Sequence, residues 1–230
     1  MQRRSDVEEV NPYGVGEKTE QVEEMFDSIA PAYDFMNRCM TFGLCGWWRN
    51  RALSMAVEAQ PRAARVLDVA TGTGDVAFQL LKRYPDAEIT GVDLSAGMLE
   101  VARRKAGEIP GGNRVRFEQG DSLALPYADG TYDLVTIAYG VRNFAHLDRG
   151  LTEICRTLRP GGTICVIELS VPANPVMRAG YNLYSNHLIP LVGRWVSGDK
   201  SAYTYLPQSI AACPQRDGMT ALMRRAGFDN

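Results

Sequence analysis

The spacing of apolar residues along the chain changes near Arg65. Before that point Val22, Met25 and Ile29 recur at intervals of three and four, with acidic side chains between them, which predicts an amphipathic helix. A further helix is predicted over residues 47–59. Beyond Arg65, short apolar runs of strand length alternate with helical patterns. We therefore expect a helical N-terminal part followed by an α/β part.

Five apolar runs in the second part are predicted to be strands. They cover residues 66–69, 88–93, 115–119, 132–138 and 164–168. Strands that alternate with helices form a doubly wound, mostly parallel sheet with right-handed crossovers. Residues 172–210 leave this pattern and predict a helical insertion, or lid, after the fifth strand. The predicted organisation is a flexible arm over residues 1–18, a helical cap on the substrate side over 19–60, and one α/β domain over 61–230 that includes the lid.

Composition and charge narrow the classes of function. The formal net charge of −2 gives no reason to expect a nucleic-acid partner. The five cysteines form no Cys-x-x-Cys pair, which argues against a disulfide framework or a metal site and suits a reducing cytosol. The N-terminus lacks the apolar core of a signal peptide, and no run approaches the ~20 apolar residues of a transmembrane segment. We expect a cytoplasmic protein whose contact with the inner face of a membrane is at most peripheral.

The first predicted strand runs into a glycine turn and a helix. Gly72 and Gly74 form the turn, and Asp75 opens the helix. A strand, a glycine turn and a helix N-terminus in this order usually place a small molecule against bare backbone. Polar residues also end the next strands, at Asp93 and Asp121. Since ligands of such sheets lie beyond the carboxyl ends of the strands, these residues predict one shared site.

Two cofactors fit a glycine turn of this kind, a dinucleotide and S-adenosylmethionine. Asp68 and Asp75 flank the turn, and two carboxylates repel a pyrophosphate but suit the amino group and sulfonium of S-adenosylmethionine. Asp93 can accept both ribose hydroxyls of either cofactor. Asp121 can accept from the adenine amino group, and Ser122 adds a hydroxyl or a backbone donor. For Asp75 and Ser122 helix capping is the alternative role. The acids favour S-adenosylmethionine.

Three segments outside this core carry a more specific resemblance. They are Met25-Phe-Asp-Ser-Ile-Ala-Pro-Ala-Tyr-Asp-Phe-Met-Asn37, Gly140-Val-Arg-Asn143 and Tyr203-Thr-Tyr-Leu-Pro-Gln-Ser-Ile210. With them the chain, from about Val22 to Phe228, resembles the ubiquinone/menaquinone biosynthesis C-methyltransferases, within the class I Rossmann-like methyltransferases. The resemblance implies cofactor contacts from Thr73, Asp93, Asp121 and Ser122. Domains of this class usually have two further strands after a segment such as Ala226-Gly-Phe228, so we expect either a longer chain or a sheet with an unusually bare edge.

The implied reaction is methyl transfer from S-adenosylmethionine to a ring carbon of a polyprenylated quinol, with demethylmenaquinol to menaquinol as the first case. Ring C-methylation of a polyprenyl-methoxy-benzoquinol in ubiquinone biosynthesis, or methylation of another apolar small molecule, is the alternative. A non-catalytic cofactor-binding scaffold is a third reading, against which the intact Asp68, Gly72, Gly74 and Asp93 argue. We expect the quinol to be reached from the membrane surface, and a homodimer is left open.

The predicted site has three parts. Cofactor contacts are expected from Asp68, Gly72, Thr73, Gly74, Asp93, Asp121 and Ser122. Arg142, in the Gly-x-Arg-Asn segment, is the catalytic candidate, because a cation lowers the pKa of a phenol or holds a water that takes its proton. The alternative for Arg142 is a structural salt bridge with Asp34 or Asp148. Substrate contacts are expected from Tyr33, Asn37, Asn143, His187 and Tyr203, with core packing as the alternative.

Overall fold

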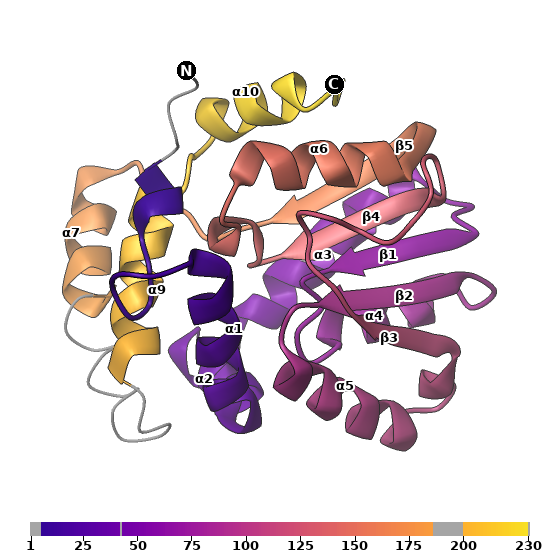
Figure 1. The fold of residues 1–230 in the computed structure, drawn as a ribbon, viewed down its shortest axis with the longest axis horizontal. Coiled ribbons are helices and arrows are strands. Elements are labelled where there is room, and N and C mark those ends of the chain that lie inside the picture. Colours follow the sequence, from indigo (N-terminus) through magenta and orange to yellow (C-terminus); the bar gives the residue numbers. More distant parts are fainter. Residues whose placement is uncertain (1–5, 42, 186–199, 230) are drawn as a thin grey trace.

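A five-stranded parallel sheet forms the centre of the molecule (Figure 1). The computed structural model of the chain describes residues 6–41, 43–185 and 200–229. The strands are β1 (Arg65–Val69), β2 (Glu88–Asp93), β3 (Val115–Gln119), β4 (Tyr132–Ala138) and β5 (Leu158–Ile167). Their order is β3-β2-β1-β4-β5. The chain changes direction across the sheet between β1 and β4, and in open α/β sheets a crevice for ligands forms at this switch point.

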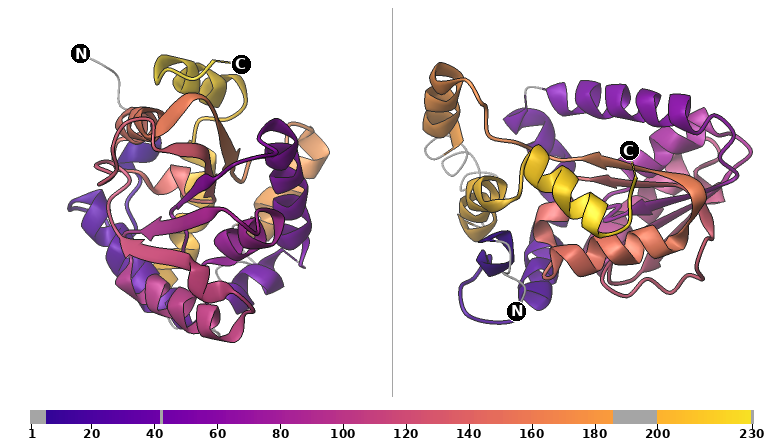
Figure 2. Two further views of the ribbon diagram at one scale, coloured as in Figure 1. Left: turned by 90° about the vertical axis from the view of Figure 1, so that its right-hand side faces the viewer. Right: turned by 90° about the horizontal axis from the view of Figure 1, so that it is seen from above.

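Helices cover both faces of this sheet and one of its ends. The N-terminal helices are α1 (Lys18–Ile29), α2 (Tyr33–Met40) and α3 (Leu44–Ala59); those between strands are α4 (Asp75–Arg83), α5 (Ala96–Glu108) and α6 (Leu147–Thr157). After β5 come α7 (Pro175–Leu183), α9 (Lys200–Ala212) and α10 (Asp217–Arg225), and the short 3-10 helices are η1 (Asp6–Glu9), η2 (Ala30–Ala32), η3 (Gly112–Arg114) and η4 (Val141–Asn143). In the right-hand view of Figure 2, α3 lies on one side of the sheet and α6 on the other. Helix α10 belongs to the core on the α6 side.

The central strand β1 is buried on both faces, which explains its continuous apolar run. Val66 packs in a core with residues of α3 and α4. Leu67 and Val69 belong to the opposite core, with residues of α6 and α10. By the same alternation Asp68 points to the α3 and α4 side. The sheet thus has two cores, and Asp68, the buried polar residue of β1, belongs to the face that α3 covers.

A cap of helices lies over the carboxyl ends of the strands (Figure 1). Its core joins Met25 and Met36 of the N-terminal helices to Met98 of α5 and Tyr205 of α9. Segments from both ends of the chain therefore build one wall of the crevice.

The predicted fold class is confirmed: the sheet is parallel and α helices flank it. The first four strands lie within one residue of their predicted bounds, but β5 begins at Leu158, six residues before the predicted start at residue 164. The early start arises because Leu158 already pairs with Tyr132 of β4, next to an irregularity in the register.

The insertion after β5 is helical in its described parts, α7 and α9, and residues 186–199 lie outside the described chain. The arm predicted over residues 1–18 differs from the structure from residue 6 onward. Val7 is fully buried, and the Leu147 N–H donates to Glu8 at 2.8 Å. The apolar Val7 makes this segment part of a sheet core.

Candidate functional site

The glycine turn between β1 and α4 has a left-handed backbone at alternate positions. The φ angles are +52° at Ala70, +56° at Gly72 and +82° at Gly74. Only glycine adopts such angles without strain. The space around a Cβ separates the two glycines: at Gly72 it would meet nothing within 4 Å, whereas at Gly74 it would lie 2.9 Å from the rings of Phe78 and Phe117. Gly72 therefore leaves open space for a ligand, and Gly74 allows close packing.

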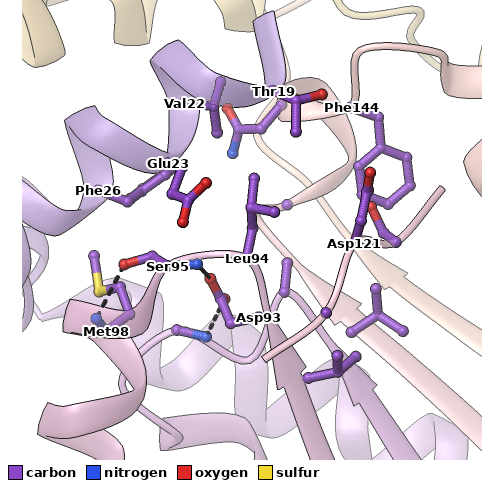
Figure 3. Close-up of a pocket in the computed structure, with 18 of the residues that line it drawn as sticks. Thr19, Val22, Glu23, Phe26, Asp93, Leu94, Ser95, Met98, Asp121 and Phe144 are labelled. Atoms are coloured by element: carbon purple, nitrogen blue, oxygen red, sulfur yellow. Dashed lines mark hydrogen bonds between the residues drawn. The ribbon is translucent and has the colours of Figure 1, made fainter. Parts of the chain in front are cut away.

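A pocket with about 750 Å³ of open space lies beyond the ends of β1, β2 and β4, and we call it the strand-end pocket. Asp93 lies at its floor, where one carboxylate oxygen accepts from the Gly72 N–H at 2.7 Å and the other from the Ser95 N–H at 2.9 Å (Figure 3). Asp121 and Ser122 line the same pocket. The structure thus brings four of the predicted cofactor residues together.

Helix α1 supplies a wall of the strand-end pocket that sequence reasoning missed. Val22, Glu23 and Phe26 lie on the turns of α1 that face the pocket (Figure 3). Asp27 fixes this helix to the start of α5, because one of its oxygens accepts from the Ser95 hydroxyl at 2.5 Å and from the Gly97 N–H at 2.8 Å. The apolar spacing of α1 signals only a buried face, and it does not say that part of this face lines a cavity.

The two acids at the ends of β1 and β2, Asp68 and Asp93, have pKa values above the ordinary range of aspartate. Burial raises the pKa of both Asp68 and Asp93 to about 6, against the hydrogen bonds that each accepts. Asp68 accepts from the hydroxyls of Thr71 and Thr136, both at 2.6 Å. It lines a smaller cavity on the α3 side of the turn, which we call the loop pocket, together with Gly72.

Two further residues of the turn line the loop pocket, but their side chains already bind other residues of the chain. Thr73 lines the loop pocket but donates its hydroxyl to Asp34 at 2.6 Å. Asp75 forms ion pairs with Arg49, at 2.9 Å, and with Lys105. Burial raises the pKa of Asp75, but its bonds to both cations outweigh this and lower it overall. Asp75 lines the loop pocket, but two cations of this chain share its charge, so its attraction for a cationic ligand is weaker than the sequence suggests.

A second cavity, the cap pocket, lies between the cap helices and the loop after β4. Arg142 is 5% exposed and donates through Nη1 to Glu168 at 2.7 Å and to the Tyr139 carbonyl at 2.6 Å. Its salt-bridge partner is thus Glu168, just after β5, and neither of the two acids expected from the sequence. The Nε–H of Arg142 and the hydroxyl of Tyr139 are buried without a hydrogen-bond partner in the described chain. Buried polar groups without a partner are rare in folded proteins, which singles out these two residues of the cavity wall.

Tyr33 and Tyr139 line the strand-end pocket, the cap pocket and the loop pocket alike. Tyr33 was predicted and carries a hydrogen bond with Asn37, another predicted residue of the cap pocket wall. Tyr139 was not predicted. Its backbone is left-handed at φ +60°, and burial raises its pKa to about 12. The three cavities therefore meet at two tyrosines.

Of the remaining predicted substrate residues, the structure describes the side chain of Asn143 but not those of His187 and Tyr203. Asn143 lines the strand-end pocket and accepts a hydrogen bond from the Tyr205 hydroxyl at 3.1 Å. His187 lies outside the described residues. Tyr203 belongs to α9, and its side chain is not among those described. Tyr205, two positions further on, lines the cap pocket instead.

The fold is that of the class I methyltransferases. Over 91% of this chain and 82% of the other, the protein resembles an S-adenosylmethionine-dependent methyltransferase from Thermotoga maritima, a possible histamine N-methyltransferase, with a TM-score of 0.62 and 21% identity. A putative methyltransferase from Bacillus halodurans matches with a TM-score of 0.58 and 23% identity over 79% of this chain and 68% of the other. The ubiE/COQ5 methyltransferase family model matches residues 15–230, and the chain belongs to this family.

Relatives agree with this assignment over most of their length. The chain is 46% identical to the demethylmenaquinone methyltransferase of Deinococcus radiodurans over 92% of this chain and 86% of that protein. It is 39% identical to the ubiquinone/menaquinone biosynthesis C-methyltransferase UbiE of Roseobacter denitrificans, over 94% of this chain and 85% of that protein. No helix within the described residues is long and apolar enough to cross a membrane.

Proposed function

We propose that the protein transfers a methyl group from S-adenosylmethionine to a ring carbon of demethylmenaquinol and so forms menaquinol. The observation that carries this proposal is the junction of two unlike cavities. The strand-end pocket has acids at its strand ends, and the cap pocket combines apolar walls with unpartnered donors. Because Tyr33 and Tyr139 line both, a donor molecule in the first and a ring in the second would meet there.

The strand-end pocket fits the adenosine part of the cofactor. Ionised Asp93 keeps lone pairs for the ribose hydroxyls beside its two backbone bonds. Asp121 uses one oxygen for the Leu123 N–H at 2.8 Å and keeps the other for the adenine amino group. Leu94, Met98 and Phe144 add apolar contacts for the base. S-adenosylmethionine supplies an activated methyl group on a cationic sulfur when it is bound.

The cap pocket fits an aromatic ring with oxygens and an apolar tail. Met25, Ile29 and Leu206 line it, and the unpartnered Nε–H of Arg142 offers a hydrogen bond to a quinol oxygen. A donor from a cation favours the ionised oxygen, which makes the neighbouring ring carbon nucleophilic. Glu168 holds the guanidinium in place and keeps its charge compensated in the buried site. A ring bound between these apolar walls would displace water from the reacting atoms, which favours a transfer that neutralises charge.

The acceptor carries a long apolar tail, and we propose that the protein takes it from the membrane surface on the cytoplasmic side. Large apolar side chains are exposed on α2 and α3: Phe35 at 59%, Leu44 at 50% and Trp47 at 64%. The cap pocket is lined by neighbours of these residues, such as Thr41 and Cys45. Figure 2 shows the start of α3 and helix α7 toward the same end of the molecule.

The reaction can be tested with labelled S-adenosylmethionine and reduced demethylmenaquinone, beside a polyprenyl benzoquinol as a second acceptor. We expect label in the naphthoquinol product. The variant Asp93→Asn should lose most of this activity, whereas Asp86→Asn, in an exposed turn, should retain it. Transfer to the benzoquinol alone would support the ubiquinone alternative, to which the name of the Roseobacter relative also extends. The absence of label from both products would contradict the proposal.

A further inference from the structure

The loop pocket is lined by two acids and a single cation among the described residues. Of the described residues that line it, Arg49 is the cationic one, and Asp68 and Asp75 are the carboxylates. Arg49 comes from α3, which covers the face of the sheet toward which Asp68 points. Its charge lowers the pKa of Asp68 against the effect of burial. The two groups therefore face a common small cavity.

The pairing of Arg49 leaves part of its binding capacity unused. Its Nη2 donates to Asp75 at 2.9 Å, but Asp75 also pairs with Lys105, which in turn reaches Asp34 at 2.9 Å. The single negative charge of Asp75 is thus shared between Arg49 and Lys105, and it does not fully compensate the charge of Arg49. The Nε–H of Arg49 is buried and has no partner among the described residues. A buried charged donor left unpaired is costly, and the cost is removed when an anionic ligand accepts from it.

S-adenosylmethionine, the cofactor of the proposed function, has an anionic group that could bind in the loop pocket. The methionine end of S-adenosylmethionine carries an ammonium and a carboxylate on one carbon. Gly72 lines both the strand-end pocket and the loop pocket, so a cofactor with its ribose at Asp93 would extend its methionine end toward the loop pocket. The Gly72 N–H already donates to Asp93, so the carboxylate needs another donor.

We propose that Arg49 binds the α-carboxylate of the cofactor's methionine part through its free Nε–H, while Asp68 faces the ammonium. The inference rests on the proposed cofactor. It assigns a role in cofactor binding to helix α3, which lies outside the glycine turn. It also explains the Arg49–Asp75 ion pair. Asp75 binds Nη2 and so orients the guanidinium, while the Nε–H stays available to the ligand.

The test compares S-adenosylmethionine with its decarboxylated form, which lacks only the carboxylate, by calorimetric titration. The wild-type protein should bind S-adenosylmethionine at least about tenfold more tightly than the decarboxylated form, as expected for a charge-assisted hydrogen bond. Arg49→Gln should bind the two compounds with similar affinity. Arg49→Lys, which keeps a charge without the planar donor edge, should retain part of the preference.

Lys105→Gln is the matched control, because Lys105 pairs with the same Asp75 carboxylate but does not line the loop pocket. This variant should keep the wild-type preference. Each preference is a ratio within one variant, so a general loss of stability does not imitate the effect. If Arg49→Gln keeps the full preference, the role of Arg49 is refuted while the cofactor assignment stands. If the wild-type protein binds neither compound, the proposed cofactor itself fails.

Discussion

At the scale of single residues, the acids of the two central strand ends differ from ordinary surface carboxylates. Burial raises the pKa of Asp68 and Asp93 to about 6. A raised pKa means that the ionised form costs the folded state free energy above pH 6, and this cost disappears as the pH falls toward 4. These two groups therefore do not drive unfolding in acid. Their ionised forms are the ones that suit ribose hydroxyls and an ammonium group.

Binding of S-adenosylhomocysteine, the product form of the proposed cofactor, should therefore depend on pH. The affinity should be constant above pH 7 and fall below pH 6, by up to about tenfold per pH unit for each carboxylate that must be ionised. Calorimetry between pH 5 and pH 7.5 measures this. In Asp93→Asn the affinity should be low throughout and its pH dependence shallower. An affinity that is unchanged down to pH 5 would contradict the role of both acids.

The sequence predicts which residues gather at the strand ends but not what each one touches. Asp93 and Asp121 were recoverable because a polar residue directly after a buried strand lies at the crevice by topology. Asp75 has the same chemistry, yet Arg49 and Lys105 reach it from α3 and α5. No local pattern encodes these two partners, since they are distant in sequence. Tyr139 directly follows the buried strand β4, so the same rule places it at the crevice, yet no contact was predicted for it.

At the scale of elements, the two glycines of the turn between β1 and α4 have different roles. Gly72 borders open space and Gly74 is packed against aromatic rings, although both have a left-handed backbone. The sequence presents them as equivalent members of one motif, and both were predicted to contact the cofactor. In the structure Gly74 lines none of the pockets described above, and its lack of a side chain serves the approach of Phe78 and Phe117.

Alanine substitutions should separate these tasks. Gly74→Ala should lower the free energy of unfolding by about 2–4 kcal/mol, the sum of backbone strain and overpacking. Gly72→Ala should cost about 1 kcal/mol, from backbone strain alone, and should weaken cofactor binding because the new methyl group enters the pocket. Urea unfolding and calorimetric titration of both variants measure the difference. Equal losses of stability in the two variants would disprove the distinction.

Elements differ in how well their sequence predicts them. The strands β2, β3 and β4 have their predicted bounds because an apolar run closed by turn residues leaves few alternatives. Helix α9 was predicted only as part of an insertion, since its aromatic and polar residues and Pro207 give no clear helical period. Its helical form depends on packing against α1 and η1, which a local pattern does not contain.

At the scale of the whole molecule, the cap pocket and the exposed apolar residues of α2 and α3 define a surface suited to a membrane. Vesicles of phosphatidylcholine and phosphatidylglycerol should bind the wild-type protein in a sedimentation assay. Trp47→Ser should reduce the bound fraction several-fold, because an interfacial tryptophan contributes both apolar area and a polar edge. Met55→Ser is the control, as Met55 is exposed on the same helix two turns further along. Failure of the wild-type protein to bind vesicles would exclude this route of substrate entry.

The two main cavities also differ in when the growing chain can complete them. The residues that line the strand-end pocket end at Ala145, whereas the cap pocket needs Ala202, Tyr205 and Leu206 of α9. Proteins are synthesised from the N-terminus, and early segments begin to fold while later ones are still being made. On the ribosome, the residues that line the strand-end pocket have thus all been synthesised well before α9, which completes the wall of the cap pocket.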